Sequence, residues 1–156
     1  MKKLFLQLSP IVCLLFIASG CSTYGDKVEV NSKSTVYYKD GGTKEQAQKV
    51  GSFLLRNNYF DDSTSKSVQV TKSNDTSIVR FVVDEEKMKS VPDAELIFSA
   101  IQFLLKDSVF NGKPTRVVLA NDVFDDIKVI KDFDPELNVR DANTTAPLAD
   151  SSANQQ

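Results

Sequence analysis

Histidine and tryptophan are both absent from this chain of 156 residues. The absence of histidine excludes nucleophilic catalysis by Ser-His-Asp or Cys-His groups and removes the commonest metal ligand. The absence of tryptophan removes the indole platform on which sugars usually stack. An enzyme of this composition would depend on carboxylates, alone or holding Mg²⁺ or Ca²⁺. Because the sequence places no two acids across a cleft, we expect no catalytic residue, no metal site and no cofactor.

Cysteine is almost absent too, and its two copies, Cys13 and Cys21, both lie near the N-terminus. The rest of the chain therefore contains no disulfide and must be stabilised by its own hydrophobic core. Residues 34–131 amount to about 100 residues, which is enough for one core and too few for two. We predict a single α+β domain at 34–131.

The N-terminus has the three parts of a secretory signal. Lys2 and Lys3 precede an apolar run at 4–17, which is followed by Ala18-Ser19-Gly20 and then Cys21. This end resembles the lipobox of bacterial lipoproteins. The resemblance implies that a diacylglycerol is attached to the Cys21 thiol, and that residues 1–20 are a signal peptide cut off before Cys21. The mature protein would then carry its acyl chains, palmitate among them, on its first residue.

Two alternatives to lipidation are simple secretion and a retained membrane anchor. The apolar run at 4–20 has 17 residues and is interrupted by Gln7 and by Ser9-Pro10. A membrane-spanning helix needs about 20 apolar residues, so a permanent anchor is disfavoured. Ser22 is not the aspartate that commonly retains lipoproteins at the inner membrane. The resemblance therefore favours the outer membrane, with the domain facing the periplasm or the cell surface.

The chain also lacks an excess of positive charge. It has 19 basic and 21 acidic residues, and loss of the signal's two lysines leaves 17 basic residues and a formal net charge of −4. Nucleic acids and anionic lipid headgroups both attract basic clusters. We therefore expect no nucleic-acid partner, no small-molecule substrate, and a membrane link through the lipid on Cys21.

Hydrophobic periodicity gives the order strand, helix, strand, strand, helix, strand. Thr43 and Gln46 have the spacing of a capping box at the start of the first helix. Gly51 lies within the apolar face of that helix, which indicates a close approach to the sheet. The predicted elements cover 36–38, 43–57, 68–71, 78–83, 90–108 and 117–120, with 127–130 as a candidate for a short final strand.

This order is typical of the ferredoxin-like fold, a βαββαβ two-layer sandwich with two helices on one face of a small sheet. We predict that fold class, with residues 21–33 as a polar tether and 132–156 as a disordered polar tail. Phe81 on the central strand and Ile101 on the second helix are expected to be among the most buried residues.

The second helix is apolar over more than half of its circumference. Its main stripe, which we expect to cover the sheet, consists of Ala94, Ile97, Ile101, Leu104 and Leu105. Leu96, Ala100 and Phe103 extend the apolar arc beyond what one sheet face requires. They are either covered by the first helix or by Val123-Phe124, or they are exposed and bind a partner protein. Leu96, Ala100 and Phe103 are therefore the candidate partner-binding residues.

These observations favour a non-enzymatic, lipid-anchored binding or assembly module for another protein of the bacterial envelope. A peptidoglycan-binding domain is the alternative, because βαββαβ is also the topology of the SPOR domain. The helix at 47–55 after an aromatic strand is similar to one in that family. A carboxylate hydrolase is a third and weaker hypothesis.

Overall fold

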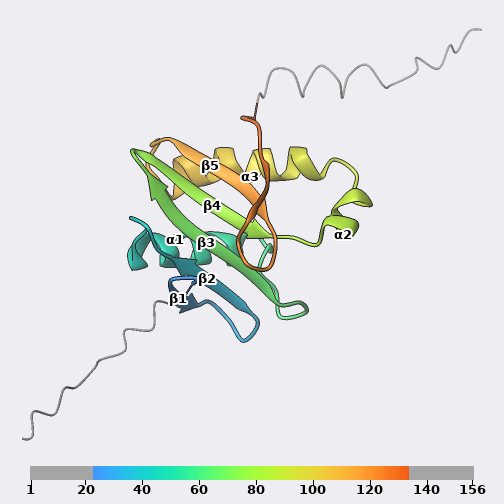
Figure 1. Ribbon diagram of the computed structural model, residues 1–156, viewed down its shortest axis with the longest axis horizontal. Helices are drawn as coiled ribbons and strands as arrows, with labels where there is room; N and C mark the ends of the chain where they lie inside the picture. The colour runs from blue at the N-terminus through green and yellow to red at the C-terminus, as the bar shows by residue number, and fades with distance from the viewer. Residues whose placement is uncertain (1–22, 134–156) are drawn as a thin grey trace, which may run out of the picture.

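The computed structural model describes residues 23–133, which form one α+β domain (Figure 1). The predictions for the signal peptide at 1–20 and for Cys21 lie outside the described residues, as does the predicted tail beyond residue 133. None of the helices within 23–133 is long and apolar enough to cross a membrane.

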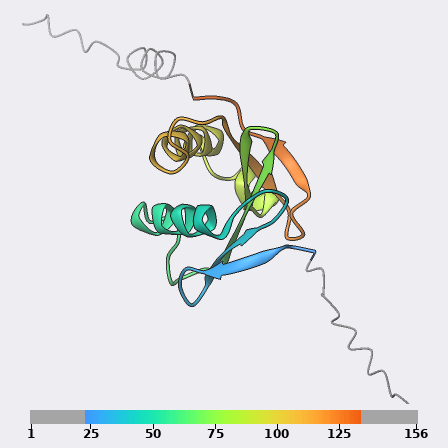
Figure 2. The same cartoon turned by 90° about the vertical axis from the view of Figure 1, so that its left-hand side faces the viewer.

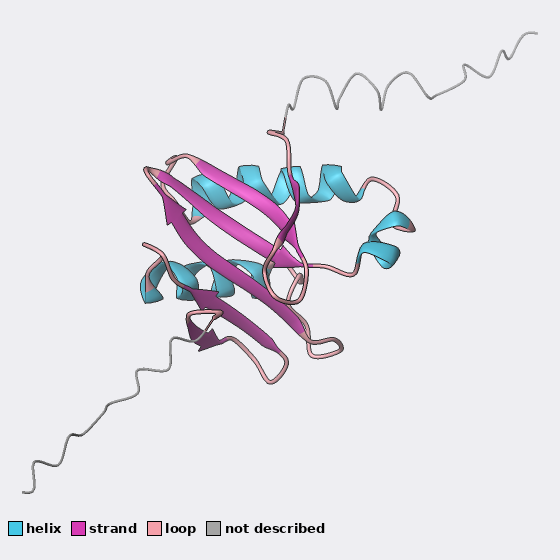
Figure 3. Cartoon of the chain, viewed as in Figure 1, coloured by secondary structure: helices cyan, strands magenta, loops and turns pink. Residues whose placement is uncertain are grey.

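A six-stranded mixed sheet forms the centre of the domain, and its strands lie side by side in sequence order. The strands are β1 (Asp26–Glu29), β2 (Ser34–Tyr38), β3 (Lys66–Ser73), β4 (Thr76–Val82), β5 (Thr115–Ala120) and β6 (Asp126–Val129). β2 pairs with β3 and β4 pairs with β5 in parallel, whereas the other three pairs are antiparallel. Figure 3 shows the strands in magenta.

Three helices complete the domain. α1 (Lys44–Arg56) connects β2 to β3, and α2 (Glu85–Lys89) with α3 (Ala94–Ser108) connects β4 to β5. Figure 2 shows α1 and α3 on the same side of the sheet. α2 has no buried residue and lies at the margin of the domain (Figure 3).

The predicted ferredoxin-like sandwich is wrong. In that fold the two strands joined by a helix are separated by another strand, whereas here each helix joins two neighbouring parallel strands. The sheet also has six strands rather than four, and there are three helices rather than two. The order of elements along the chain is compatible with either arrangement, because periodicity identifies strands but not their neighbours.

β1 lies within residues 21–33, the segment expected to be a tether. It is an exposed edge strand, and Lys27 and Glu29 on it form an ion pair. Charged side chains are typical of edge strands because they discourage pairing with other chains. The same charges gave this segment the polar composition of a linker.

α1 begins and packs as expected from the sequence. The Thr43 hydroxyl accepts a hydrogen bond from the Gln46 N–H, and the Gln46 side chain accepts one from the Thr43 N–H, which completes the capping box. A Cβ atom on Gly51 would lie 2.6 Å from Cγ2 of Val30 and 3.5 Å from Cγ2 of Val36. The close approach predicted at Gly51 is therefore confirmed, and it is made against β2 and the residue that follows β1.

The main core lies between the sheet and the two long helices. Phe81 has no exposed surface, which confirms its predicted burial. Ile101 is only partly buried at the margin of this core. The prediction that Ile97 and Leu104 of α3 cover the sheet is wrong, because both are exposed. The helix is rotated so that Phe98, Gln102 and Leu105 face the sheet instead.

An aromatic cluster covers part of the other face of the sheet. The ring of Tyr24, just before β1, lies 5.8 Å from that of Tyr37 on β2 and 5.7 Å from that of Phe124 in the β5–β6 loop. The Gln69 side chain donates a hydrogen bond to the Tyr24 carbonyl at 3.0 Å. The N-terminal segment and the β5–β6 loop thus meet across the sheet from its two edges.

Candidate protein-binding surface on α3

Eight of the 15 residues of α3 are strong helix formers, and the C-terminal end of the helix is defined by local backbone geometry. Asn111 and Gly112 follow the helix with positive φ angles of 54° and 77°. The Gly112 N–H donates a hydrogen bond to the Lys106 carbonyl at 2.8 Å. This pattern satisfies a carbonyl that the last helical turn would otherwise leave unpaired.

Two apolar side chains fix which face of α3 meets the sheet. The Phe98 ring packs edge-on against Phe81, with the ring centroids 5.3 Å apart, and lies 6.4 Å from Tyr59. Leu105 lies seven residues further along and has no exposed surface. Residues seven apart lie on the same face of a helix, so these contacts set the rotation of α3 about its own axis.

Gln102 lies between these two residues and connects the helix to the sheet by hydrogen bonds. Its side-chain oxygen accepts a hydrogen bond from the Val117 N–H of β5 at 2.7 Å. Its side-chain nitrogen donates one to Asp132, also at 2.7 Å. A buried amide with both partners in place specifies one orientation of the helix, because any other orientation leaves polar groups unpaired.

As a consequence, the opposite face of α3 exposes four large apolar side chains. Leu96 is 40% exposed, Ile97 50%, Phe103 44% and Leu104 43%. Ala100 lies among them and is half-buried. These five residues, Leu96, Ile97, Ala100, Phe103 and Leu104, are called the α3 ridge below.

The ridge contains all three candidate partner-binding residues, Leu96, Ala100 and Phe103, and brings them together with Ile97 and Leu104. Periodicity had assigned those last two to the core. The buried face could have been found from the spacing of Phe98, Gln102 and Leu105, but a glutamine in its centre makes the face look polar. Partner binding by the ridge stays a prediction.

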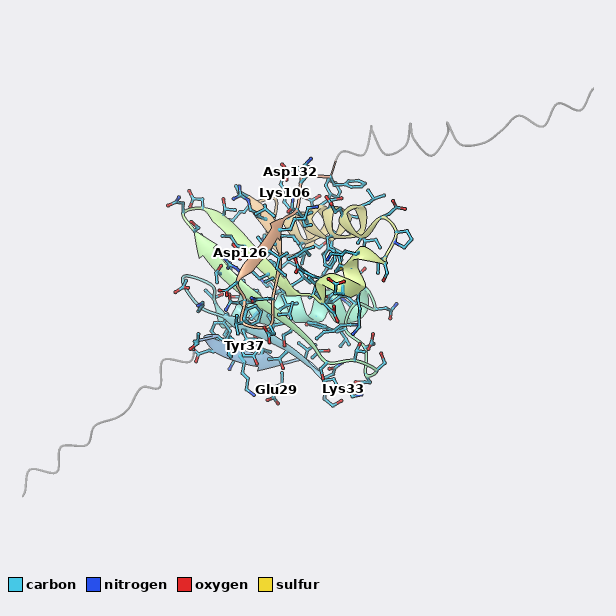
Figure 4. All side chains as sticks on the ribbon, turned by 45° about the vertical axis from the view of Figure 1, so that its right-hand side comes forward. Glu29, Lys33, Tyr37, Lys106, Asp126 and Asp132 are labelled. Carbon is cyan, nitrogen blue, oxygen red and sulfur yellow. The ribbon has the colours of Figure 1, made fainter. Side chains whose placement is uncertain are left out.

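Charged residues lie along one flank of the ridge. Glu95, in the first turn of α3, forms an ion pair with Lys128 of β6. Lys106 lies near the other end of the helix, eleven residues further on. Figure 4 shows Lys106 and Asp132 at one end of the domain and Glu29 and Lys33 at the opposite end.

Each end of the ridge borders a hollow. A pocket of ≈ 630 Å³ lies between α2, the start of α3 and β6, and Leu96 is part of its wall. A second pocket of ≈ 680 Å³ includes Phe103 and Lys106 together with the end of β6. The Phe133 ring lies 5.9 Å from the Phe103 ring at this second end. The ridge is therefore a raised apolar strip between two depressions.

Residues 27–132 match the model of a domain family that is described as a "family N-terminal domain". The chain belongs to this uncharacterised family. The family N-terminal domain begins within β1 and ends just after β6, so it includes the edge strand and the whole of the α3 ridge. No functionally curated protein and no solved structure matches the chain.

Acidic residues of the family N-terminal domain do not gather into a metal site within 23–133, where no group of three or more potential ligands occurs. Asp61 has the most strongly perturbed carboxyl group described. The Lys66 ammonium, the Ser63 hydroxyl and the Thr64 and Ser63 N–H groups hold the pKa of Asp61 well below its usual range. These contacts join the loop between α1 and β3 to Lys66, the first residue of β3, which gives Asp61 a structural role.

Proposed function

We propose that this chain is a lipid-anchored lipoprotein of the bacterial cell envelope, and that it binds an envelope protein through the α3 ridge without catalysing a reaction. The observation that carries this proposal is the exposure of Leu96, Ile97, Phe103 and Leu104 on one helix face. Isolated exposed apolar residues are normal on a protein surface, whereas a contiguous group of them is typical of an interaction site.

The packing of α3 supports this interpretation of the ridge. The helix already covers the sheet with Phe98, Gln102 and Leu105, so the ridge residues are not needed to complete the core. An apolar helix face that the domain itself does not cover is suited to packing against another protein, as in helix-in-groove recognition.

The lipid anchor is proposed from Ala18, Ser19, Gly20 and Cys21, which resemble a lipobox. The position of Tyr24 gives this anchor a structural consequence. Tyr24 is packed against Tyr37 and Phe124, only three residues after Cys21. Three extended residues span about 10 Å, so a lipid on Cys21 would hold the Tyr24 end of the domain close to the bilayer.

No second function is proposed. Peptidoglycan binding was inferred from the ferredoxin-like topology, and the strand order removes that basis. A carboxylate hydrolase would require two acids facing each other in a cleft with opposed pKa shifts. The described carboxyl groups with resolved shifts all have lowered pKa values, and none has the raised pKa of a general acid.

The proposal is tested by Phe103→Glu with a photo-crosslinking amino acid at Leu104, in full-length chain expressed in bacterial cells. We expect the substitution to abolish crosslinking, because the charge would have to be desolvated in the complex. Leu55→Glu is the matched control, since Leu55 is 42% exposed on α1 and lies outside the ridge. Thermal unfolding of both variants should stay close to that of the wild type. Undiminished crosslinking by folded Phe103→Glu protein would contradict the proposal.

A further inference from the structure

The first described residues of the chain lie on the surface of the domain. Residues 23–30, called the strap below, include Tyr24, β1 and Val30, and β1 is the strand at one edge of the sheet (Figure 1). None of the strap residues is fully buried. Segments with little buried surface open at a lower free-energy cost than the core of a domain. Opening of the strap is therefore expected to cost less than unfolding of the domain.

The end of the strap nearest Cys21 is held by the aromatic cluster. The Tyr24 ring packs against Tyr37 and Phe124, and the Tyr24 carbonyl accepts a hydrogen bond from the Gln69 side chain at 3.0 Å. Tyr24 nevertheless stays partly exposed. These contacts hold the free end of the strap against the sheet, and they can be broken without disturbing the core on the other face.

The remainder of the strap docks in one defined position. β1 pairs with β2 in antiparallel register, and Asp26 lies opposite Tyr38 at the end nearest the N-terminus. Val28 and Val30 pack against the margin of the core. Val30 occupies the space that a side chain at Gly51 would need, since a Cβ there would lie 2.6 Å from Cγ2 of Val30. The strap therefore has a specific docking site on the domain.

The turn that follows the strap is attached to another part of the domain. The Asn31 side chain accepts a hydrogen bond from the Ser34 N–H at 2.6 Å and donates one to the Asp61 carbonyl at 3.3 Å. The Lys33 ammonium donates to the Ser63 carbonyl at 3.0 Å. These bonds join the turn to the loop after α1. A strap that detaches from its free end would therefore stop at Asn31.

We infer that the strap is an extensible link between the lipid anchor and the domain, which detaches from the sheet under tension and docks again when the tension ends. This inference rests on the lipid anchor proposed at Cys21. When the strap is docked, about 10 Å of chain separates Cys21 from Tyr24, whereas after release the ten residues from Cys21 to Asn31 extend to about 35 Å. The domain then reaches a partner farther from the membrane without losing its anchor.

The direction of the load favours release of the strap alone. Tension on Cys21 reaches Tyr24 first and then the pair of Asp26 and Tyr38. Hydrogen bonds of an antiparallel pair are perpendicular to the strands, so a pull on the free end of β1 loads them one after another. β2 stays paired with β3 when β1 leaves, so the other five strands remain one sheet.

The composition of the strap suits both states. Asp26, Lys27 and Glu29 are exposed while the strap is docked. The ion pair between Lys27 and Glu29 lies within the strap, so release does not break it. Release transfers mainly the partly buried side chains of Tyr24, Val28 and Val30 to water. This balance explains why the segment has the composition of a tether although it is part of the sheet.

Stretching single molecules with optical tweezers tests the link. One handle is attached to the Cys21 thiol and the other to the C-terminus of full-length Cys13→Ser chain, made by cell-free synthesis so that no lipid is attached. We expect two steps. The first occurs at low force, lengthens the molecule by on the order of 20 Å and reverses on relaxation, and the second unfolds the rest of the domain.

Moving the handle past the strap provides the control. With Ser32→Cys and Cys21→Ser, the load enters at an exposed residue of the turn and bypasses the strap, so the first step should be absent. A single step with the handle at Cys21 would overturn the inference. So would a first step that persists with the handle at residue 32. Neither outcome bears on the lipid anchor, because the handle replaces the lipid.

Tyr24→Ala tests what holds the free end. It should lower the force of the first step and leave the force of the second step unchanged. Leu55→Ala is the matched control, since Leu55 is 42% exposed on α1 and lies outside the strap, and it should change neither step. If Tyr24→Ala lowered the second step instead, Tyr24 would belong to the cooperative core, and the strap would not be separable from it.

Hydrogen exchange in increasing urea measures release without load. The β1 amides should exchange through an opening that depends only weakly on urea, because little surface becomes exposed. The amides of β4, at the centre of the sheet, should exchange only through global unfolding, with its full urea dependence. Equal opening free energies and equal urea dependence for the two strands would show that the strap opens only with the whole domain, and would overturn the inference.

Discussion

At the level of single residues, the Asp61 carboxylate organises the loop between α1 and β3. It accepts hydrogen bonds from the Ser63 and Thr64 N–H groups at 2.9 and 3.1 Å, and it forms an ion pair of 2.6 Å with Lys66. The Lys66 ammonium also donates to the Tyr59 carbonyl at 2.7 Å. The ion pair of Asp61 and Lys66 therefore connects the loop that follows α1 to the first residue of β3.

The pKa of Asp61 makes this contribution to stability dependent on pH. Because the pKa is lowered in the folded state, the carboxylate stabilises the fold above the unfolded value of about 3.9, and the effect is lost as pH falls toward the folded pKa. We expect the deficit in unfolding free energy of Asp61→Asn to be largest near pH 6 and to shrink below about pH 4. Urea unfolding of both proteins at a series of pH values measures it.

Asp62→Asn is the control, since Asp62 is an exposed aspartate next to Asp61 in the same loop. It should leave the free energy of unfolding near pH 6 close to that of the wild type. A deficit of Asp61→Asn that stays constant between pH 3 and pH 7 would show that the charge of Asp61 is not the source of its contribution.

At the level of elements, α1 packs closely against the β1–β2 edge at Gly51. We expect alanine at this position to destabilise the domain, although alanine has the higher helix propensity. Alanine is favoured over glycine within a helix by about 1 kcal/mol. At position 51, however, its Cβ would lie 2.6 Å from Cγ2 of Val30. Overpacking of this kind typically costs 1–3 kcal/mol. We therefore expect Gly51→Ala to lower the free energy of unfolding by roughly 1 kcal/mol net.

The double variant with Val30→Ala identifies the cause. Removing the Val30 methyl groups should make Gly51→Ala less destabilising than it is in the wild-type background, because the two sites are in contact. Denaturant unfolding of the four proteins completes the cycle. A stabilising effect of Gly51→Ala would contradict this explanation. So would additive effects of Gly51→Ala and Val30→Ala on the free energy of unfolding, because glycine would then be required for a reason other than contact with Val30.

The elements also indicate how much of the fold could be derived from sequence. The α1 capping box of Thr43 and Gln46 depends on residues close together in the chain and was found. Strand order depends on contacts between distant segments, and local periodicity contains no information about it. β1 was missed because an exposed edge strand has the same polar composition as a linker.

Only part of the candidate site could be derived from the sequence, again because contacts between distant segments decide the structure. A helix that is apolar on most sides has no unique buried face, so its rotation is decided by the partners available in three dimensions. Here the decisive partners are the Phe81 ring and the Val117 N–H. The sequence identified Leu96, Ala100 and Phe103 as candidates, but it could not show that Ile97 and Leu104 are exposed beside them.

At the level of the whole molecule, the proposed lipid anchor and the α3 ridge would act together. Tyr24, three residues after Cys21, packs against Tyr37 and Phe124, so a lipid on Cys21 would hold the domain close to the membrane. Confinement to a surface raises the effective concentration of the chain, so a contact with a membrane-bound partner that is weak in solution becomes favourable there.

Cys21→Ala tests the proposed lipid anchor. Without the thiol no diacylglycerol can be attached, and the lipoprotein-specific cleavage that requires it cannot follow. We expect an unprocessed precursor that takes up no fatty acid analogue in metabolic labelling, whereas the wild type is labelled and shortened by the 20-residue signal. Cys13→Ala should be labelled and processed normally, because Cys13 lies within the signal. Equal labelling of Cys21→Ala and the wild type would reject the lipid anchor and leave binding by the α3 ridge to be explained without a membrane.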